Sequence, residues 1–197
     1  LERAVALAEK ALQLFWDTSR GGFYLTKRTD DELFLKEKPH LDMAIPSGNS
    51  VMYDLFTRLG RLTGNQEFEQ TGEEIGKSLS KQIAGVPYAH TYLLAAIEEN
   101  LSRRREVVVV GWPEAEQTKK MLDFLNHTYM PGKIVLVKSP HESTNEEQDI
   151  ASLVPHLAHY KMMDNETTVY VCENFACQRP VTDLESLKEL LAREIIV

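Results

Sequence analysis

One short peptide carries the residues best suited to binding chemistry. Ile45-Pro46-Ser47-Gly48-Asn49-Ser50 comes just before an amphipathic pattern, so Ser47 and Asn49 are expected at the start of a helix. That position offers free backbone N–H groups beside two short polar side chains. An asparagine amide both donates and accepts hydrogen bonds, which suits sugar hydroxyls. The peptide therefore indicates a carbohydrate-binding position.

Side chains from other parts of the first ninety residues could complete such a site. Asp17 and Asp42 are the nearest carboxylates for acid–base chemistry, and His40 and His90 are the nearest imidazoles. Aromatic rings could add flat faces for stacking against a sugar. The resulting hypothesis has catalytic groups at Asp17, Asp42 and His90, and substrate-binding groups at Trp16, Tyr24, Ser47 and Asn49.

The same residues also fit purely structural roles. Ser47 and Asn49 can cap a helix, Gly48 permits a tight turn, and the aromatic rings can fill a core. Asp17 precedes a Gly21-Gly22 breaker, where a carboxylate often stabilises a turn. Helix capping is the more common role for such a serine and asparagine, and both interpretations stay open at this stage.

Two cysteines end a hydrophobic segment in the second half of the chain. Cys172 and Cys177 are separated by four residues, whereas a thioredoxin-type redox pair is Cys-x-x-Cys at a helix N-terminus. We expect small buried thiols that pack a strand end and are non-catalytic, although a disulfide forms if the loop curls back. Thiol redox chemistry is a third, weaker functional hypothesis.

Composition excludes several classes of function. The net charge of −8 argues against nucleic acid as the main partner, and no apolar run approaches the length of a membrane helix. Two cysteines in 197 residues favour a reducing compartment, which predicts a cytoplasmic protein. No ligand spacing links the cysteines to nearby histidines, so we expect no metal and no cofactor.

Helical periodicity dominates the first half of the chain. Apolar stripes at residues 1–16, 51–62 and 68–79 each end at a polar or glycine-containing breaker, and residues 87–101 form a fourth stripe. Gly64 suits the left-handed position that ends a helix, and Asn65 can cap the next one. Residues 1–105 are therefore expected to be helical hairpins.

An α/β pattern replaces these stripes at Val107. Apolar runs at residues 106–111, 134–137 and 168–172 alternate with helical segments, and Pro113 suits the first turn of the first of these helices. Strands that alternate with helices usually run parallel with crossover connections. Residues 106–197 are therefore expected to form a small three-stranded parallel α/β subdomain, which makes the whole chain mainly α with an α/β part.

Several motifs together resemble one protein family. They are the Ser47-Gly48-Asn49 peptide, the run 170–177 ending in Cys177, and the segment from Phe15 to Tyr24 with its Gly21-Gly22 pair. These motifs resemble the C-terminal region of thioredoxin-domain-containing proteins related to spermatogenesis-associated protein 20. The segment 15–24 is also similar to loops in N-acylglucosamine 2-epimerases. At Asp42 the sequence departs from the family pattern, because His40 and Leu41 replace a more usual Tyr-Asp-Gly or Asp-Gly.

This resemblance implies a specific architecture and two competing functions. The helical half would be part of an (α/α)6 toroid like that of six-hairpin glycosidases, and an upstream thioredoxin-like domain with further toroid helices would be its partner in a longer protein. One function is binding or processing of carbohydrate. The alternative is a non-catalytic binding or scaffolding module beside a redox domain. As a fragment, the chain is also expected to expose apolar helix faces and to self-associate.

Overall fold

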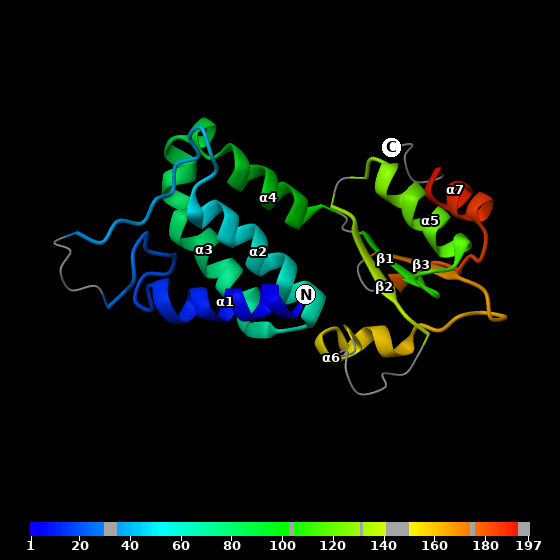
Figure 1. Cartoon of the computed structure of the whole chain (residues 1–197). Coiled ribbons are helices and arrows are strands. Elements are labelled where there is room, and N and C mark those ends of the chain that lie inside the picture. The colour runs from blue at the N-terminus through cyan, green and yellow to red at the C-terminus, as the bar shows by residue number, and fades with distance from the viewer. Residues whose placement is uncertain (30–34, 103–104, 131, 141–149, 174–175, 193–197) are drawn as a thin grey trace. The chain divides into compact units, whose positions relative to one another are not determined.

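A computed structural model of the protein describes residues 1–29, 35–102, 105–130, 132–140, 150–173 and 176–192 (Figure 1). The chain divides into two compact units, Leu1–Leu101 and Ser102–Val197. Within the described residues no helix is both long and apolar enough to cross a lipid bilayer. The first unit contains α1 (Glu2–Phe15), α2 (Gly48–Thr63), α3 (Gln66–Gly85), a 3-10 turn η1 (Pro87–Ala89) and α4 (Thr91–Leu101).

The ends of α2 and α3 follow from local sequence. The Ser47 side chain accepts a hydrogen bond from the backbone N–H of Ser50 and so caps α2. Gly64 ends the same helix in the left-handed conformation at φ 68°, and Asn65 caps α3 by accepting from the N–H of Glu67. The predicted caps at Ser47, Gly64 and Asn65 are therefore confirmed, because each depends only on neighbouring residues.

Close packing joins α2 to α3 in the core of the first unit. A Cβ atom at Gly60 would lie 2.6 Å from the side chain and 2.7 Å from the backbone nitrogen of Glu69, so only glycine allows this approach. Aromatic rings continue the core toward the loop after α1. Phe56 stacks on Phe23 with 5.6 Å between ring centroids and meets Phe68 edge-on at 5.5 Å.

The predicted single helix over residues 87–101 is wrong, because it is interrupted at His90. Residues Pro87–Ala89 form one 3-10 turn, and the α-helix begins only at Thr91. His90 has φ −130°, outside the helical range. The backbone N–H groups of Tyr92 and Leu93, in the first turn of α4, donate to the side chain of Asp42.

The second unit is a mixed sheet, which corrects the predicted parallel subdomain. Its strands are β1 (Arg105–Val110), β2 (Ile134–Lys138), β3 (Thr168–Glu173) and β4 (Ala176–Cys177), in the order β2-β1-β3-β4. β1 pairs in parallel with β2 but antiparallel with β3, and β3 pairs antiparallel with β4. The helical elements are α5 (Glu116–His127), α6 (Ile150–Leu153), a 3-10 turn η2 (Pro155–His159) and α7 (Leu184–Ala192).

The connection between β2 and β3 explains the change of strand direction. A parallel return needs a crossover that carries the chain back along the sheet, but the four-residue α6 rises only about 6 Å at 1.5 Å per residue. The described part of the connection after residue 149 returns to the end where β2 finishes. Lys138 there donates hydrogen bonds to the carbonyls of Leu157 and Tyr160, and β3 starts with Thr168 opposite Val110.

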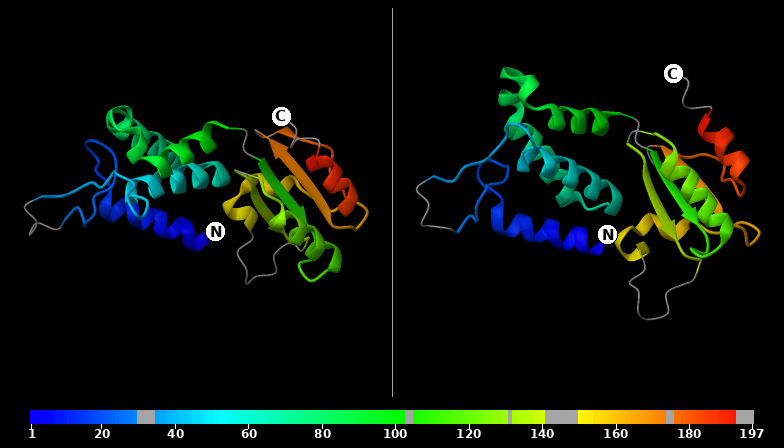
Figure 2. Two further views of the ribbon diagram at one scale, coloured as in Figure 1. Left: turned by 90° about the horizontal axis from the view of Figure 1, so that it is seen from above. Right: turned by 45° about the horizontal axis from the view of Figure 1, so that its top comes forward.

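Helices cover one face of this sheet. α5 and α7 pack together on that face, as Figures 1 and 2 show, and bury Val107, Val109, Val169 and Val171. Alternate residues of the same strands, among them Glu106 and Cys172, therefore face the other side. α5 starts at Glu116 rather than at Pro113, because residues 112–115 form a turn closed by the Ala115 N–H and the Trp112 carbonyl.

Candidate functional site

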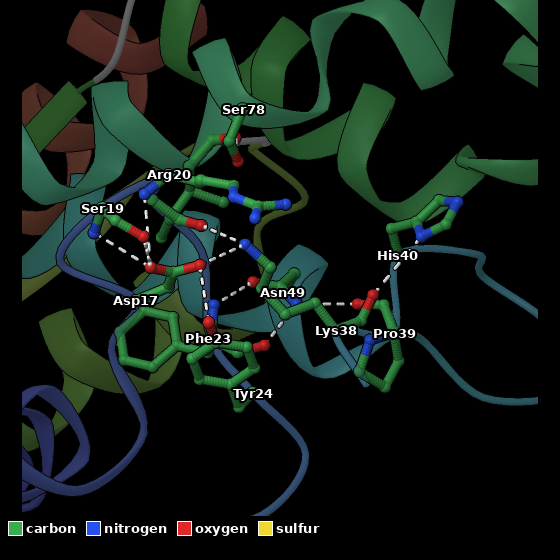
Figure 3. A network of polar contacts seen from close by, with 12 residues as sticks. Asp17, Ser19, Arg20, Phe23, Tyr24, Lys38, Pro39, His40, Asn49 and Ser78 are labelled. Atoms are coloured by element: carbon green, nitrogen blue, oxygen red, sulfur yellow. Dashed lines mark hydrogen bonds and ion pairs between the residues drawn. The ribbon is translucent and has the colours of Figure 1, made fainter. Parts of the chain in front are cut away.

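The Asp17 carboxylate lies at the centre of a polar network in the first unit (Figure 3). It follows the end of α1 and is 4% exposed. Its Oδ1 accepts hydrogen bonds from the backbone and hydroxyl of Ser19 and from the N–H of Arg20. Its Oδ2 accepts from the Tyr24 hydroxyl at 2.8 Å and from Lys38 Nζ at 2.7 Å. Both oxygens are thus engaged.

These contacts keep Asp17 ionised. Burial by itself raises the pKa of the carboxyl, but the hydrogen bonds from Lys38, Ser19 and Tyr24 outweigh it and hold the pKa well below its usual range. Such a group carries no proton near neutral pH and has no free oxygen to accept one. This environment suits a structural anion better than the predicted catalytic acid or base.

The Asn49 side chain holds the loop after α1 in place. Its Oδ1 accepts from the N–H of Phe23 at 2.7 Å, and its Nδ2 donates to the carbonyls of Phe23 at 3.0 Å and Pro39 at 2.7 Å. Asn49 is 1% exposed, and the approach requires glycine at position 22, which has φ 80°. The amide predicted to bind sugar therefore points into the protein and binds backbone.

Asp42 links the N-termini of two helices. Its Oδ1 accepts from the N–H of Ser47, which caps α2, and its Oδ2 accepts from the N–H groups of Tyr92 and Leu93 in α4. Burial raises the pKa of Asp42, but these hydrogen bonds lower it more, so the net shift is downward. A carboxylate at helix N-termini is electrostatically favourable, so these contacts give Asp42 a structural role.

His90 differs from the predicted carboxylates because it keeps an unused polar atom. The residue is fully buried, and its Nδ1 lies 2.9 Å from the Val86 carbonyl. A ring nitrogen that faces a carbonyl oxygen donates, so Nδ1 carries a proton, and Nε2 has no hydrogen-bond partner among the residues that the structure describes. The ring stacks on His40 at 5.8 Å between centroids.

The two predicted stacking residues are engaged with their neighbours. Trp16 meets Phe23 edge-on at 5.0 Å. Lys38 Nζ lies 5.3 Å from the centroid of the Tyr24 ring, and the Tyr24 hydroxyl binds Asp17. Lys38 is the residue of this network that sequence reasoning missed, since a lysine 21 positions from Asp17 gives no local signal of an ion pair.

The predicted site residues thus fall into two neighbouring groups. Trp16, Asp17, Tyr24 and Asn49 form one, joined through Phe23 and Lys38. Asp42 and Ser47 form the other, at the N-termini of α2 and α4. Asn49 connects the groups by its bond to Pro39, next to His40 and its partner His90. Among the described residues, no cluster of three or more histidine, cysteine or acidic side chains could hold a metal ion.

The cysteines of the second unit are joined in a disulfide, so the expectation of free buried thiols is wrong. Cys172 is 3% exposed on β3, whereas Cys177 on β4 is exposed to solvent. The two residues face each other in the antiparallel pairing of these strands. Sequence reasoning missed this because the two-residue β4 has no detectable periodicity.

Comparison with known proteins finds similarity to longer proteins across nearly the whole chain. No family model matches the chain. The chain is 29% identical to spermatogenesis-associated protein 20 of Rattus norvegicus over 192 residues, which are 97% of the chain and 24% of that protein. Identity to the Homo sapiens protein of the same name is 28% over the same shares. An uncharacterized protein of Caenorhabditis elegans is 24% identical over 96% of the chain and 25% of its own length.

These similarities establish distant homology to spermatogenesis-associated protein 20 over nearly the whole chain. The chain spans about a quarter of the length of these relatives. The resemblance inferred from the motifs is confirmed at this level.

Proposed function

We propose that the helical unit is a non-catalytic binding module of a larger α/α toroid. The observation that supports this is that the two candidate catalytic carboxylates are both held ionised by hydrogen bonds within the protein. Asp17 and Asp42 both have a lowered pKa, and their oxygens bind Lys38, hydroxyl groups and backbone N–H groups. An acid–base pair needs a group that can take up or release a proton near neutral pH, and neither carboxylate meets this requirement.

The binding surface we propose is an exposed apolar patch, defined as Leu41, Met43, Ile45 and Tyr88. These side chains are 42%, 79%, 76% and 83% exposed, respectively. The backbone N–H of Asp42 donates to the Ala89 carbonyl, so the loop and η1 lie against each other. The partner we propose is further polypeptide of a longer protein, because the relatives are about four times as long. From the family resemblance we propose that this polypeptide comprises toroid helices and a thioredoxin-like domain upstream.

Hydrogen exchange tests the partner. A longer protein that carries the proposed upstream segments should protect residues 41–46 and 87–89 more than the isolated chain does. A Tyr88→Asp substitution should remove this extra protection, whereas Tyr129→Asp in the second unit, at a side chain 88% exposed, should leave it unchanged. Equal exchange with and without the upstream segments contradicts the proposed interface.

Carbohydrate processing is the second candidate, and His90 is the observation that favours it. The buried His90 ring stacks on His40, and its Nε2 is not used by any hydrogen bond within the described residues, so this nitrogen is the one to test for a catalytic role. Incubation with a panel of mono- and disaccharides, followed by NMR of the products, distinguishes the two functions. Turnover that is lost in His90→Gln but retained in the exposed control His127→Gln would overturn the non-catalytic proposal.

A further inference from the structure

A polar cluster lies beside the disulfide on the sheet face opposite α5 and α7. The Tyr160 hydroxyl lies 3.3 Å from Cys172 Sγ and 3.2 Å from Cys177 Sγ, so a single hydroxyl reaches both sulfurs. The Tyr160 ring also packs on Tyr170, with 4.8 Å between centroids. The disulfide therefore has a hydrogen-bonding group, the Tyr160 hydroxyl, in contact with both of its sulfurs.

An acid–base pair continues this cluster. Glu106 faces Cys172 in the register of β1 and β3. Its Oε1 lies 2.6 Å from His156 Nε2, and the His156 ring meets the Tyr160 ring edge-on at 6.4 Å. Carboxylate, imidazole, phenol and disulfide therefore follow one another across one face of the sheet. None of these groups belongs to the network of the first unit.

The two cysteine residues differ in access to solvent. Cys177 is exposed, and Cys172 is buried on β3. An incoming thiolate therefore reaches Cys177 Sγ more readily, and Cys172 Sγ is the leaving group. Burial, followed by the charge of Glu106, raises the pKa of Tyr160, so its hydroxyl keeps its proton near neutral pH. That hydroxyl can donate a hydrogen bond to the leaving thiolate.

We propose that Cys172 and Cys177 form a redox-active pair that accepts two electrons from a dithiol. The first thiolate of the dithiol bonds to Cys177 Sγ, the Sγ–Sγ bond breaks, and Cys172 leaves as a thiolate. The second thiol of the donor, as thiolate, attacks the donor sulfur of the mixed disulfide and releases Cys177. The donor is oxidised to a disulfide, the protein pair is reduced, and the two donor protons end on the two cysteines.

The short sequence separation of Cys172 and Cys177 favours a redox role for the disulfide over a purely structural one. The bridge closes a segment of only five sequence positions, and short loops gain least from a cross-link. β3 and β4 are already paired by the backbone at this point. In a reducing compartment, which the low cysteine content predicts, persistent disulfides are rare and redox-cycling ones are the usual exception. The sequence-based expectation of a non-catalytic pair did not include Tyr160, which is twelve residues before Cys172.

The rate of reduction tests the role of Tyr160. The whole folded chain is mixed with reduced dithiothreitol, quenched with iodoacetamide at set times, and weighed by mass spectrometry. We expect full reduction without loss of far-UV circular dichroism, and a rate about tenfold lower in Tyr160→Phe. The matched control Tyr129→Phe, at an exposed tyrosine of the same unit, should react like wild type.

Single-cysteine variants test the order of attack. With oxidised glutathione, Cys172→Ser should form a mixed disulfide at Cys177 rapidly, and Cys177→Ser should react at Cys172 at least tenfold more slowly because that sulfur is buried. Three results overturn the proposal: a pair that resists excess dithiothreitol in the folded protein, reduction that unfolds the second unit, or equal rates in Tyr160→Phe and wild type. A reversed preference between the two cysteines overturns the proposed order of attack.

Discussion

Replacing Asn49 by alanine should destabilise the helical unit rather than only weaken a ligand site. The substitution removes two buried hydrogen bonds and one partly buried one, and leaves the N–H and carbonyl of Phe23 and the carbonyl of Pro39 without their partner. At about 1 kcal/mol for each bond, the free energy of unfolding should fall by about 3 kcal/mol.

Urea unfolding followed by the fluorescence of Trp16 measures this effect. Trp16 contacts Phe23, whose backbone Asn49 holds, and a Trp112→Phe background makes it the single tryptophan of the chain. Asn65→Ala is the matched control, because it removes an exposed helix cap with an expected cost of about 1 kcal/mol. If the two variants lose equal stability, Asn49 does not hold the loop and the reasoning is refuted.

Two further predictions concern pH and association. The folded-state pKa of Asp17 lies below its unfolded value near 4, so its contribution to stability is fully present above about pH 4 and is lost as the pH falls through the folded value. Asp17→Asn should therefore lower stability at pH 7 by about 2 kcal/mol and flatten the loss of stability below pH 4. Urea midpoints at pH 7 and pH 3 test this, and an unchanged midpoint at pH 7 contradicts it. The isolated chain should also self-associate, because Leu7, Leu25 and Leu101 are 60%, 64% and 81% exposed. Its sedimentation coefficient should rise with concentration, and a monomer at all concentrations is the opposing result.

Local signals in the sequence were enough to place the ends of α1, α2 and α3. The caps at Ser47, Gly64 and Asn65 and the end of α1 before Gly21-Gly22 each depend on residues within one or two turns, so their side chains and backbone preferences decide the outcome. The valine run 107–110 likewise identified a buried strand, because four apolar residues in succession need cover on both faces.

Contacts between distant segments decided the partners of the polar side chains, the direction of β3 and the pairing of the cysteines. Asn49 binds a backbone 26 residues away, and Asp42 caps a helix 50 residues away, so their roles as structural groups could not be inferred from spacing. The direction of β3 depended on where a short connection ended, and not on the strand's own residues. The Cys172–Cys177 bond and its contact with Tyr160 exist because β4 pairs with β3 and η2 lies beside them. A sequence determines which residues prefer a helix, a turn or a strand, whereas the partners of its polar side chains arise only once the chain has folded.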